Sequence, residues 1–135
     1  MSIVGIDYGA RRIGVAVSDS GVLATPHSVV ANVGDAVERI AAIGREVEAE
    51  LFVVGIARRA HASEGERRFR DFAEKLRQKT CKEVVLWDEA LSTVEAAEKL
   101  RASGRKRRDA ERDIDMHAAA VILQSYLDEH PRRQP

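Results

Sequence analysis

Short apolar segments crowd the first 30 residues of this chain, and their order limits the folds that it can adopt. Residues 1–8 and 13–18 are rich in β-branched side chains and flank a short turn, which predicts two strands of a hairpin. A third strand is expected over 22–30, near an edge of the sheet, because Pro26 cannot donate a ladder hydrogen bond. Three antiparallel strands followed by helices are the first indication of the architecture.

The hydrophobic period changes after this hairpin region. Apolar residues over 37–49 fall near helical spacing, and a further helix is expected after residue 63. The uninterrupted apolar run at 51–56 is typical of a central strand covered on both faces, and 84–87 predicts another buried strand. A helix is then expected to begin at about residue 92. The chain therefore alternates helices and strands after its first three strands.

The C-terminal third is expected to hold one long helix after a polar segment. Residues 103–112 are expected to be the least structured part, and the last helix is expected over about 113–129. A length of 135 residues fits one compact domain, which we expect to span 1–130, with 131–135 as a disordered tail. No apolar stretch reaches membrane-spanning length and no signal peptide is evident, so a cytoplasmic protein without a membrane partner is expected.

Three acidic residues, each beside a different apolar segment, carry the strongest functional signal. Asp7 ends the first predicted strand, Glu89 follows the strand at 84–87, and Asp115 opens the apolar part of the last helix. Carboxylates at the ends of buried strands are costly unless positive charge lies between them. Hard divalent cations such as Mg²⁺ prefer carboxylate oxygens and keep water molecules for a phosphate substrate. The three acids therefore point to metal-assisted phosphodiester chemistry.

Each acid also has a structural explanation when it is taken alone. Asp7 could belong to an ordinary hairpin turn, Glu89 could solvate a strand end, and Asp115 could stabilise a helix N-terminus through the macrodipole. Gly14 favours the functional interpretation of Asp7, because a glycine inside a strand weakens packing unless a ligand or backbone comes near. Small alanines one turn after Asp115 would let the helix approach the sheet closely and bring Asp115 toward Asp7.

Clusters of basic residues are the candidates for contacting phosphates. The formal net charge is zero, so any affinity for nucleic acid must come from local clustering of Lys and Arg. The candidates are Arg11, Arg12, Arg58, Arg59, Arg105, Lys106, Arg107 and Arg108. A solvated loop is the usual meaning of such a run, but three clusters beside the acidic positions favour nucleic acid as the partner. Aromatic stacking platforms are scarce, so base-specific reading of single strands is not supported.

In their order and spacing, these motifs resemble the YqgF/RuvX family, described as pre-16S rRNA nucleases or Holliday junction resolvase-like proteins. The segments that carry the resemblance are 5–9, 12–19, 54–56, 88–93, 115, 118–119 and 122–127. The resemblance implies an α/β, ribonuclease H-like fold. Its mixed five-stranded sheet would have three antiparallel strands, then two parallel strands, with helices on both faces. It also implies that Asp7, Glu89 and Asp115 form a site for Mg²⁺ or Mn²⁺, where ions activate water and stabilise the leaving oxygen.

The chain departs from the family pattern at two places. The family usually has Arg after the Asp-Glu pair, where this chain has Ala90. The family also continues from Val-Gly-Leu-Pro into a loop containing Asn and Gly, whereas residues 54–61 read Val-Gly-Ile-Ala-Arg-Arg-Ala-His. A lost Arg would remove a charge-assisted phosphate contact, which Arg58 or Arg59 could replace. The departures concern substrate handling rather than the acids.

Three classes of function are compatible with these observations. The leading hypothesis is a metal-dependent endonuclease in 5′-end processing of precursor 16S ribosomal RNA, or alternatively a Holliday junction resolvase acting on branched DNA. A non-catalytic nucleic-acid-binding relative would show salt-sensitive binding without turnover. A nucleotide-binding protein of the actin and hexokinase type is disfavoured, because the chain is too short for two lobes. A monomer and a homodimer are both open, although resolving a junction requires a dimer.

Overall fold

The computed structural model describes residues 2–56, 63–87 and 107–130. In this part of the chain the strands are β1 (Ser2–Tyr8), β2 (Arg12–Ser18), β3 (Thr25–Ala31), β4 (Ala49–Ile56) and β5 (Glu83–Trp87). The helices there are α1 (Ala36–Glu46), α2 (Ser63–Thr80) and α4 (Arg107–Glu129). The helix expected from about residue 92 and the expected tail at 131–135 lie outside the described residues. No helix in the described ranges combines the length and the apolar character needed to cross a membrane.

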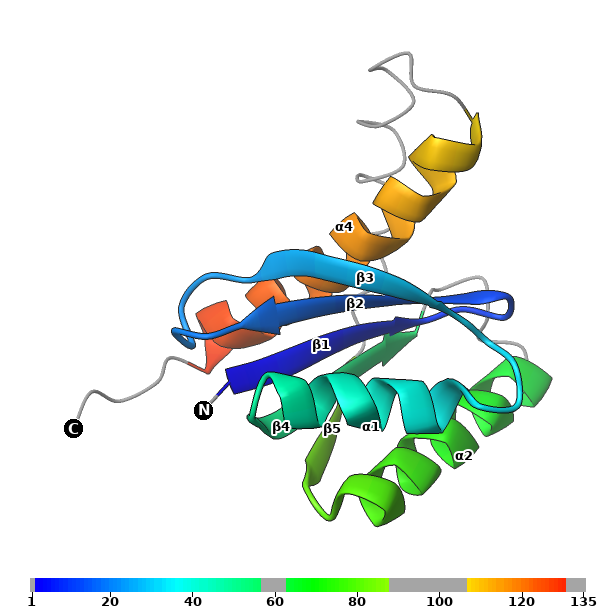
Figure 1. The fold of residues 1–135 in the computed structure, drawn as a ribbon, viewed down its shortest axis with the longest axis horizontal. Coiled ribbons are helices and arrows are strands. Elements are labelled where there is room, and N and C mark those ends of the chain that lie inside the picture. The colour runs from blue at the N-terminus through cyan, green and yellow to red at the C-terminus, as the bar shows by residue number, and fades with distance from the viewer. Residues whose placement is uncertain (1, 57–62, 88–106, 131–135) are drawn as a thin grey trace.

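The strands form one mixed sheet in the order β3-β2-β1-β4-β5. β1 pairs antiparallel with β2, and β2 with β3, whereas β1, β4 and β5 run parallel. Helices α1 and α2 cover one face of this sheet and α4 lies across the other (Figure 1). The predicted sheet, with three antiparallel strands, two parallel strands and helices on both faces, is confirmed. The carboxyl ends of β1, β4 and β5 lie at one edge, where binding sites of parallel sheets usually form.

Two hydrophobic cores alternate along β1, because successive side chains of a strand point to opposite faces. Val4, Ile6 and Tyr8 pack in the larger core, against α1 and α2. Ile3 belongs to the core beneath α4. Asp7 shares the parity of Ile3, so its side chain lies on the α4 face at the carboxyl end of the strand.

Several boundaries differ from the prediction, and Ala49, which was expected in a helix, begins β4. Strand β3 begins at Thr25 rather than at residue 22. Pro26 lies in this edge strand and pairs with Ala16 of β2, next to a shift in the pairing register between Val15 and Ala16. Helix α4 begins at Arg107 rather than near 113, so part of the supposedly least structured segment is helical. The prediction was wrong there because it followed apolar periodicity. The charged start of α4 contains Arg, Glu and Ala, which favour a helix without an apolar stripe.

Candidate active site

Asp7 lies between two glycines at the carboxyl end of β1. It pairs with Gly14 of β2 on one side and with Gly55 of β4 on the other. Residues that pair directly across neighbouring strands project to the same face of the sheet. Asp7 is 6% exposed, so its carboxylate is largely withdrawn from water. The flanking glycines carry no side chains, so α4 can pack closely against the sheet beside this acid.

Helix α4 rests directly on the glycine positions of the sheet. A methyl group at Gly14 would overlap the backbone oxygen of Asp115. At Gly5 a Cβ atom would lie 2.5 Å from Cβ of Leu123, and at Gly55 it would lie 2.8 Å from Cδ1 of Ile122. Since Gly14 is the cross-strand partner of Asp7, this packing brings the backbone of Asp115 against the strand position next to Asp7. The backbone of Asp115 therefore lies at the same corner of the sheet as Asp7.

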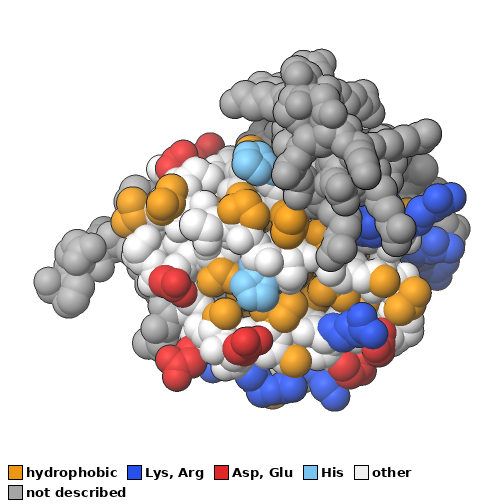
Figure 2. All heavy atoms as spheres, turned by 45° about the horizontal axis from the view of Figure 1, so that its top comes forward, with side chains coloured by type: hydrophobic (Ala, Val, Ile, Leu, Met, Phe, Trp, Pro, Cys, Tyr) orange, Lys and Arg blue, Asp and Glu red, His pale blue; other side chains and the backbone are white. Residues whose placement is uncertain are grey.

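Arg12 forms an ion pair with Asp115. Its Nε donates a hydrogen bond to Oδ2 of Asp115 over 2.6 Å, and the two side chains are 40% and 19% exposed. Sequence analysis assigned Arg12 to nucleic acid and Asp115 to metal, and did not anticipate this contact across 103 residues of chain. Arg11 beside it is exposed. On the surface drawn in Figure 2, Lys and Arg side chains lie at the right, the side on which β1 ends in Figure 1, and also along the lower edge.

Several predicted site residues fall outside the described structure. These are Glu89, Arg58, Arg59, Arg105 and Lys106, together with the family departures at Ala90 and in the 57–61 loop. Arg107 and Arg108 begin α4, but their side chains are not described. Within the described ranges no group of three His, Cys, Asp or Glu side chains is placed to hold a metal. The third acid predicted for the site therefore stays a prediction.

The last residue of β5, Trp87, contacts α4 and lies two residues before Glu89 in the sequence. Trp87 pairs with Gly55, the residue that also pairs with Asp7. Its Nε1 donates to Oγ of Ser125 over 3.3 Å, and its ring meets Tyr126 edge-on at 5.4 Å between centroids. Trp87 therefore lies on the α4 face, and the chain leaves the described part of β5 at the same edge as Asp7.

The titration of Tyr126 tests how α4 sits on the end of β5. Burial raises the pKa of the Tyr126 phenol above its usual value, and the negative charge of Glu83 raises this pKa further. We expect a Tyr8→Phe variant, which leaves Tyr126 as the only tyrosine, to titrate above the usual tyrosine pKa by ultraviolet difference absorbance. Adding Glu83→Gln should lower the pKa of Tyr126 only partly, because burial is the larger cause. An ordinary tyrosine pKa would contradict this packing.

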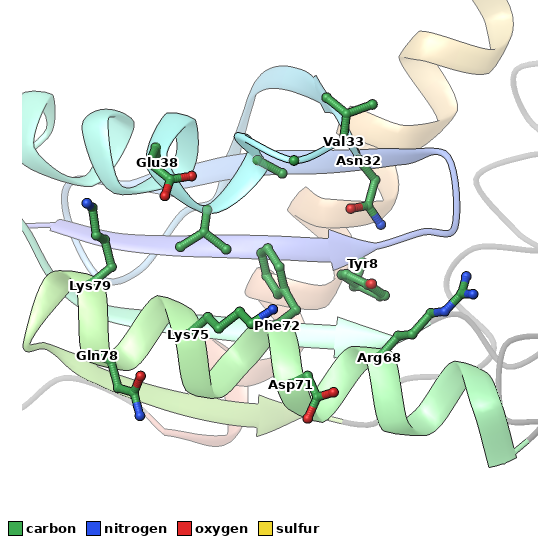
Figure 3. A pocket seen from close by; sticks show the side chains of 13 residues that line it. Tyr8, Asn32, Val33, Glu38, Arg68, Asp71, Phe72, Lys75, Gln78 and Lys79 are labelled. Atoms are coloured by element: carbon green, nitrogen blue, oxygen red, sulfur yellow. The ribbon is translucent and has the colours of Figure 1, made fainter.

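A hollow on the opposite face of the sheet was missed by sequence analysis. The cavity measures about 660 Å³, and Arg68, Lys75 and Lys79 of α2 line one side of it (Figure 3). Its lining also includes Glu38 and Asp71, so positive and negative charges are mixed there. Because its walls come from segments far apart in the sequence, only the seven- and four-residue spacing of the basic residues on α2 could have signalled it. It opens beside Tyr8, on the other face from Asp7.

Solved structures share this arrangement of sheet and helices. The chain is similar to T. thermophilus RuvC in complex with a Holliday junction substrate, with a TM-score of 0.59, 19% identity and 96% of each chain covered. It is also similar to the Fowlpox virus resolvase in complex with Holliday junction DNA, with a TM-score of 0.58, 10% identity, and coverage of 98% of this chain and 100% of that chain. At these identities the likeness concerns the fold, which is ribonuclease H-like as predicted.

Sequence relatives identify the family more closely. A protein of Anaeromyxobacter dehalogenans (strain 2CP-C), named "Putative pre-16S rRNA nuclease", is 40% identical over 141 residues, with 100% of both chains covered. A protein of Lactococcus lactis subsp. cremoris (strain MG1363) with the same name is 37% identical over 135 residues, covering 95% of this chain and 94% of its own. The family model for RuvX, described as Holliday junction resolvase, matches residues 1–129.

The mixed sheet of this order is the ribonuclease H-like fold, and the family model and the full-length relatives place the chain among the nucleases with this fold. Nucleases of this class hydrolyse phosphodiester bonds. With the match over residues 1–129 and full-length relatives near 40% identity, the chain belongs to the RuvX family. The resemblance drawn from its motifs is confirmed.

Proposed function

We propose that this protein is a cytoplasmic, divalent-metal-dependent endonuclease that processes the 5′ end of precursor 16S ribosomal RNA. The names of its full-length relatives support the choice of substrate. The observation that carries the proposal is the contact of Gly14 with the backbone of Asp115, because it joins two predicted metal ligands from opposite ends of the chain. A single acid beside a turn would have no such partner.

The donor set suits a hard divalent cation. Asp7 and Asp115 offer carboxylate oxygens at one edge of the sheet, one largely buried and the other partly buried. Asp7, Asp115 and Glu89 would hold Mg²⁺ or Mn²⁺, which prefer oxygen ligands. When bound, the metal would lower the pKa of a coordinated water and stabilise charge on the leaving oxygen of the phosphodiester. Glu89 is included among these proposed ligands because of its place in the sequence, two residues after Trp87.

The protein's own groups would orient the substrate around this centre. Asp7 lies on a central strand, where pairing on both sides limits its movement. Arg12 begins the neighbouring strand and Arg11 directly precedes it, and their positive charge would attract a phosphate backbone to the acids. Arg58, Arg59, Arg105, Lys106, Arg107 and Arg108 are proposed to extend this contact. No side chain is assigned as a separate general base.

Branched DNA is the second candidate substrate. It is favoured by the description of the matching family as Holliday junction resolvase. Resolution of a four-way junction requires two symmetric cuts and hence a dimer, whereas trimming an RNA end requires only one active site. The oligomeric state, measured by sedimentation with and without each substrate, therefore helps to decide between RNA and branched DNA.

The experiment compares labelled precursor 16S RNA with a labelled four-way DNA junction, each with Mg²⁺, Mn²⁺ or a chelator. We expect nicking of the RNA that requires metal and falls at least about 100-fold in Asp115→Asn and in Glu89→Gln, because each loses a charged oxygen ligand. Asp71→Asn removes an equivalent charge from α2 on the other face and should cut normally. Cleavage that survives chelation would contradict the proposal. Salt-sensitive binding without cleavage would instead identify a non-catalytic relative.

A further inference from the structure

The ion pair between Arg12 and Asp115 joins two elements that the chain brings together only on folding. It links the start of β2 to α4 through a short, charge-assisted hydrogen bond of 2.6 Å. The pair is only partly exposed at Asp115, so this contact is less screened than an ion pair in open water. In this arrangement, the positive charge of Arg12 lies beside Asp115, one of the predicted metal ligands.

The same oxygen cannot serve Arg12 and a metal ion without a cost. A Mg²⁺ ion lies about 2.1 Å from a carboxylate oxygen that binds it. With Nε of Arg12 2.6 Å from Oδ2 of Asp115, the two cations could be at most about 5 Å apart. Like charges at that separation repel appreciably in a partly buried site. Metal binding at Oδ2 therefore favours departure of the guanidinium.

Arg12 can leave without disturbing the strand. Its backbone is paired with Ala31 of β3, and the carbonyl of the preceding Arg11 accepts a hydrogen bond from the Asn32 amide over 2.9 Å. The side chain is 40% exposed, so it has access to solvent around a fixed backbone. The guanidinium fork matches a phosphate as well as it matches a carboxylate.

We infer that Arg12 is a metal-gated positioning residue. In the metal-free protein it neutralises Asp115; when a divalent cation takes Oδ2, the guanidinium is released and binds a phosphate of the nucleic acid. The inference rests on the proposed metal site. It makes the contribution of Arg12 to substrate binding depend on prior metal binding, so the loaded site holds nucleic acid more tightly than the metal-free site.

Calorimetric titration with Mn²⁺ alone, without nucleic acid, tests the competition. Arg12→Ala should bind Mn²⁺ about 3- to 10-fold more tightly than the original chain, because a competing cation has been removed. Arg12→Lys, which keeps the charge but lacks Nε, should fall between them. Arg11→Ala removes the same charge at the neighbouring exposed position and should change the affinity less than about twofold. Circular dichroism checks that each variant is folded.

The opposite result is equally informative. If Arg12 only orients Asp115, as supporting residues around metal ligands often do, its loss should weaken Mn²⁺ binding, and this outcome would overturn the inference. Unchanged affinity in both Arg12 variants would also overturn it. If the original chain and every variant fail to bind Mn²⁺, the proposed metal site itself fails. The titration therefore distinguishes failure of the inference about Arg12 from failure of the proposed metal site.

Binding of a fluorescent four-way DNA junction tests the second half of the inference. Ca²⁺, which also takes carboxylate oxygens, replaces Mn²⁺ so that binding is measured with a cation at the site. Arg12→Ala should weaken junction binding about fivefold with Ca²⁺ but less than about twofold with chelator, since the released guanidinium is available only in the loaded protein. Equal losses under both conditions would overturn the gating.

Discussion

Replacement of Asp7 by Asn should lower metal-dependent cleavage by a factor of at least about 10³ while the protein stays folded. Asn has nearly the same shape but cannot offer a charged oxygen ligand to a divalent cation. Asp7 is 6% exposed and next to the strand position that Asp115 covers, so it is the most enclosed of the acids that the structure describes at this corner. Single-turnover cleavage measures the loss of activity, and Mn²⁺ calorimetry measures the loss of metal affinity that causes it.

Stability separates this chemical effect from simple unfolding. A buried carboxylate is costly to desolvate, so Asp7→Asn should have a free energy of unfolding within about 1 kcal/mol of the original chain, or above it. Urea denaturation in the presence of chelator measures this quantity. Asp71→Asn, on α2, is the matched control and should retain cleavage. Normal cleavage by a folded Asp7→Asn protein would remove Asp7 from the catalytic centre.

Gly14→Ala should destabilise the protein by about 3 kcal/mol, the upper range for overpacking a core. The added methyl group would overlap the backbone oxygen of Asp115, and a backbone atom cannot turn aside as a flexible side chain can. Helix α4 must therefore move away from β2. Because the same contact places Asp115 beside the partner of Asp7, Mn²⁺ affinity should fall together with the free energy of unfolding.

Gly34→Ala is the matched control for this substitution. A Cβ atom at Gly34 meets no heavy atom within 4 Å, and the residue is exposed before α1. Its free energy of unfolding should stay within about 0.5 kcal/mol of the original chain, as for most surface substitutions. If Gly14→Ala were equally harmless, α4 would not rest on β2 as the structure has it. Both values come from urea denaturation with the same chelator.

The architecture was largely predictable because its signals are local. β-Branched runs and the change from strand to helical period identified every strand of the sheet, and Pro26 correctly predicted an edge position for β3. The start of α4 was not predictable in this way. Its first turns at Arg107 and beyond are charged, and apolar spacing contains no information about a helix that lacks an apolar stripe.

The candidate site was predictable only as a list of residues. Gly14 was expected to allow a close approach, and the structure identifies the approaching group as the backbone of Asp115. The pairing of Arg12 with Asp115 was not predictable, because nothing in the spacing of two residues 103 positions apart indicates that they touch. The hollow beside Tyr8 was missed for the same reason. Glu89 remains a prediction from its place after β5.

By itself, the sequence determined which segments become the strands of the sheet, which apolar periodic segments become helices, and that Asp7 shares a face of β1 with Ile3. These properties follow from side-chain periods of two and 3.6 residues, which each segment carries within itself. The tertiary structure alone decided that α4 packs against the glycines of β1, β2 and β4. It also decided that Arg12 forms an ion pair with Asp115. Those contacts depend on how distant segments pack together, because close packing selects one relative placement of helix and sheet that no local pattern specifies.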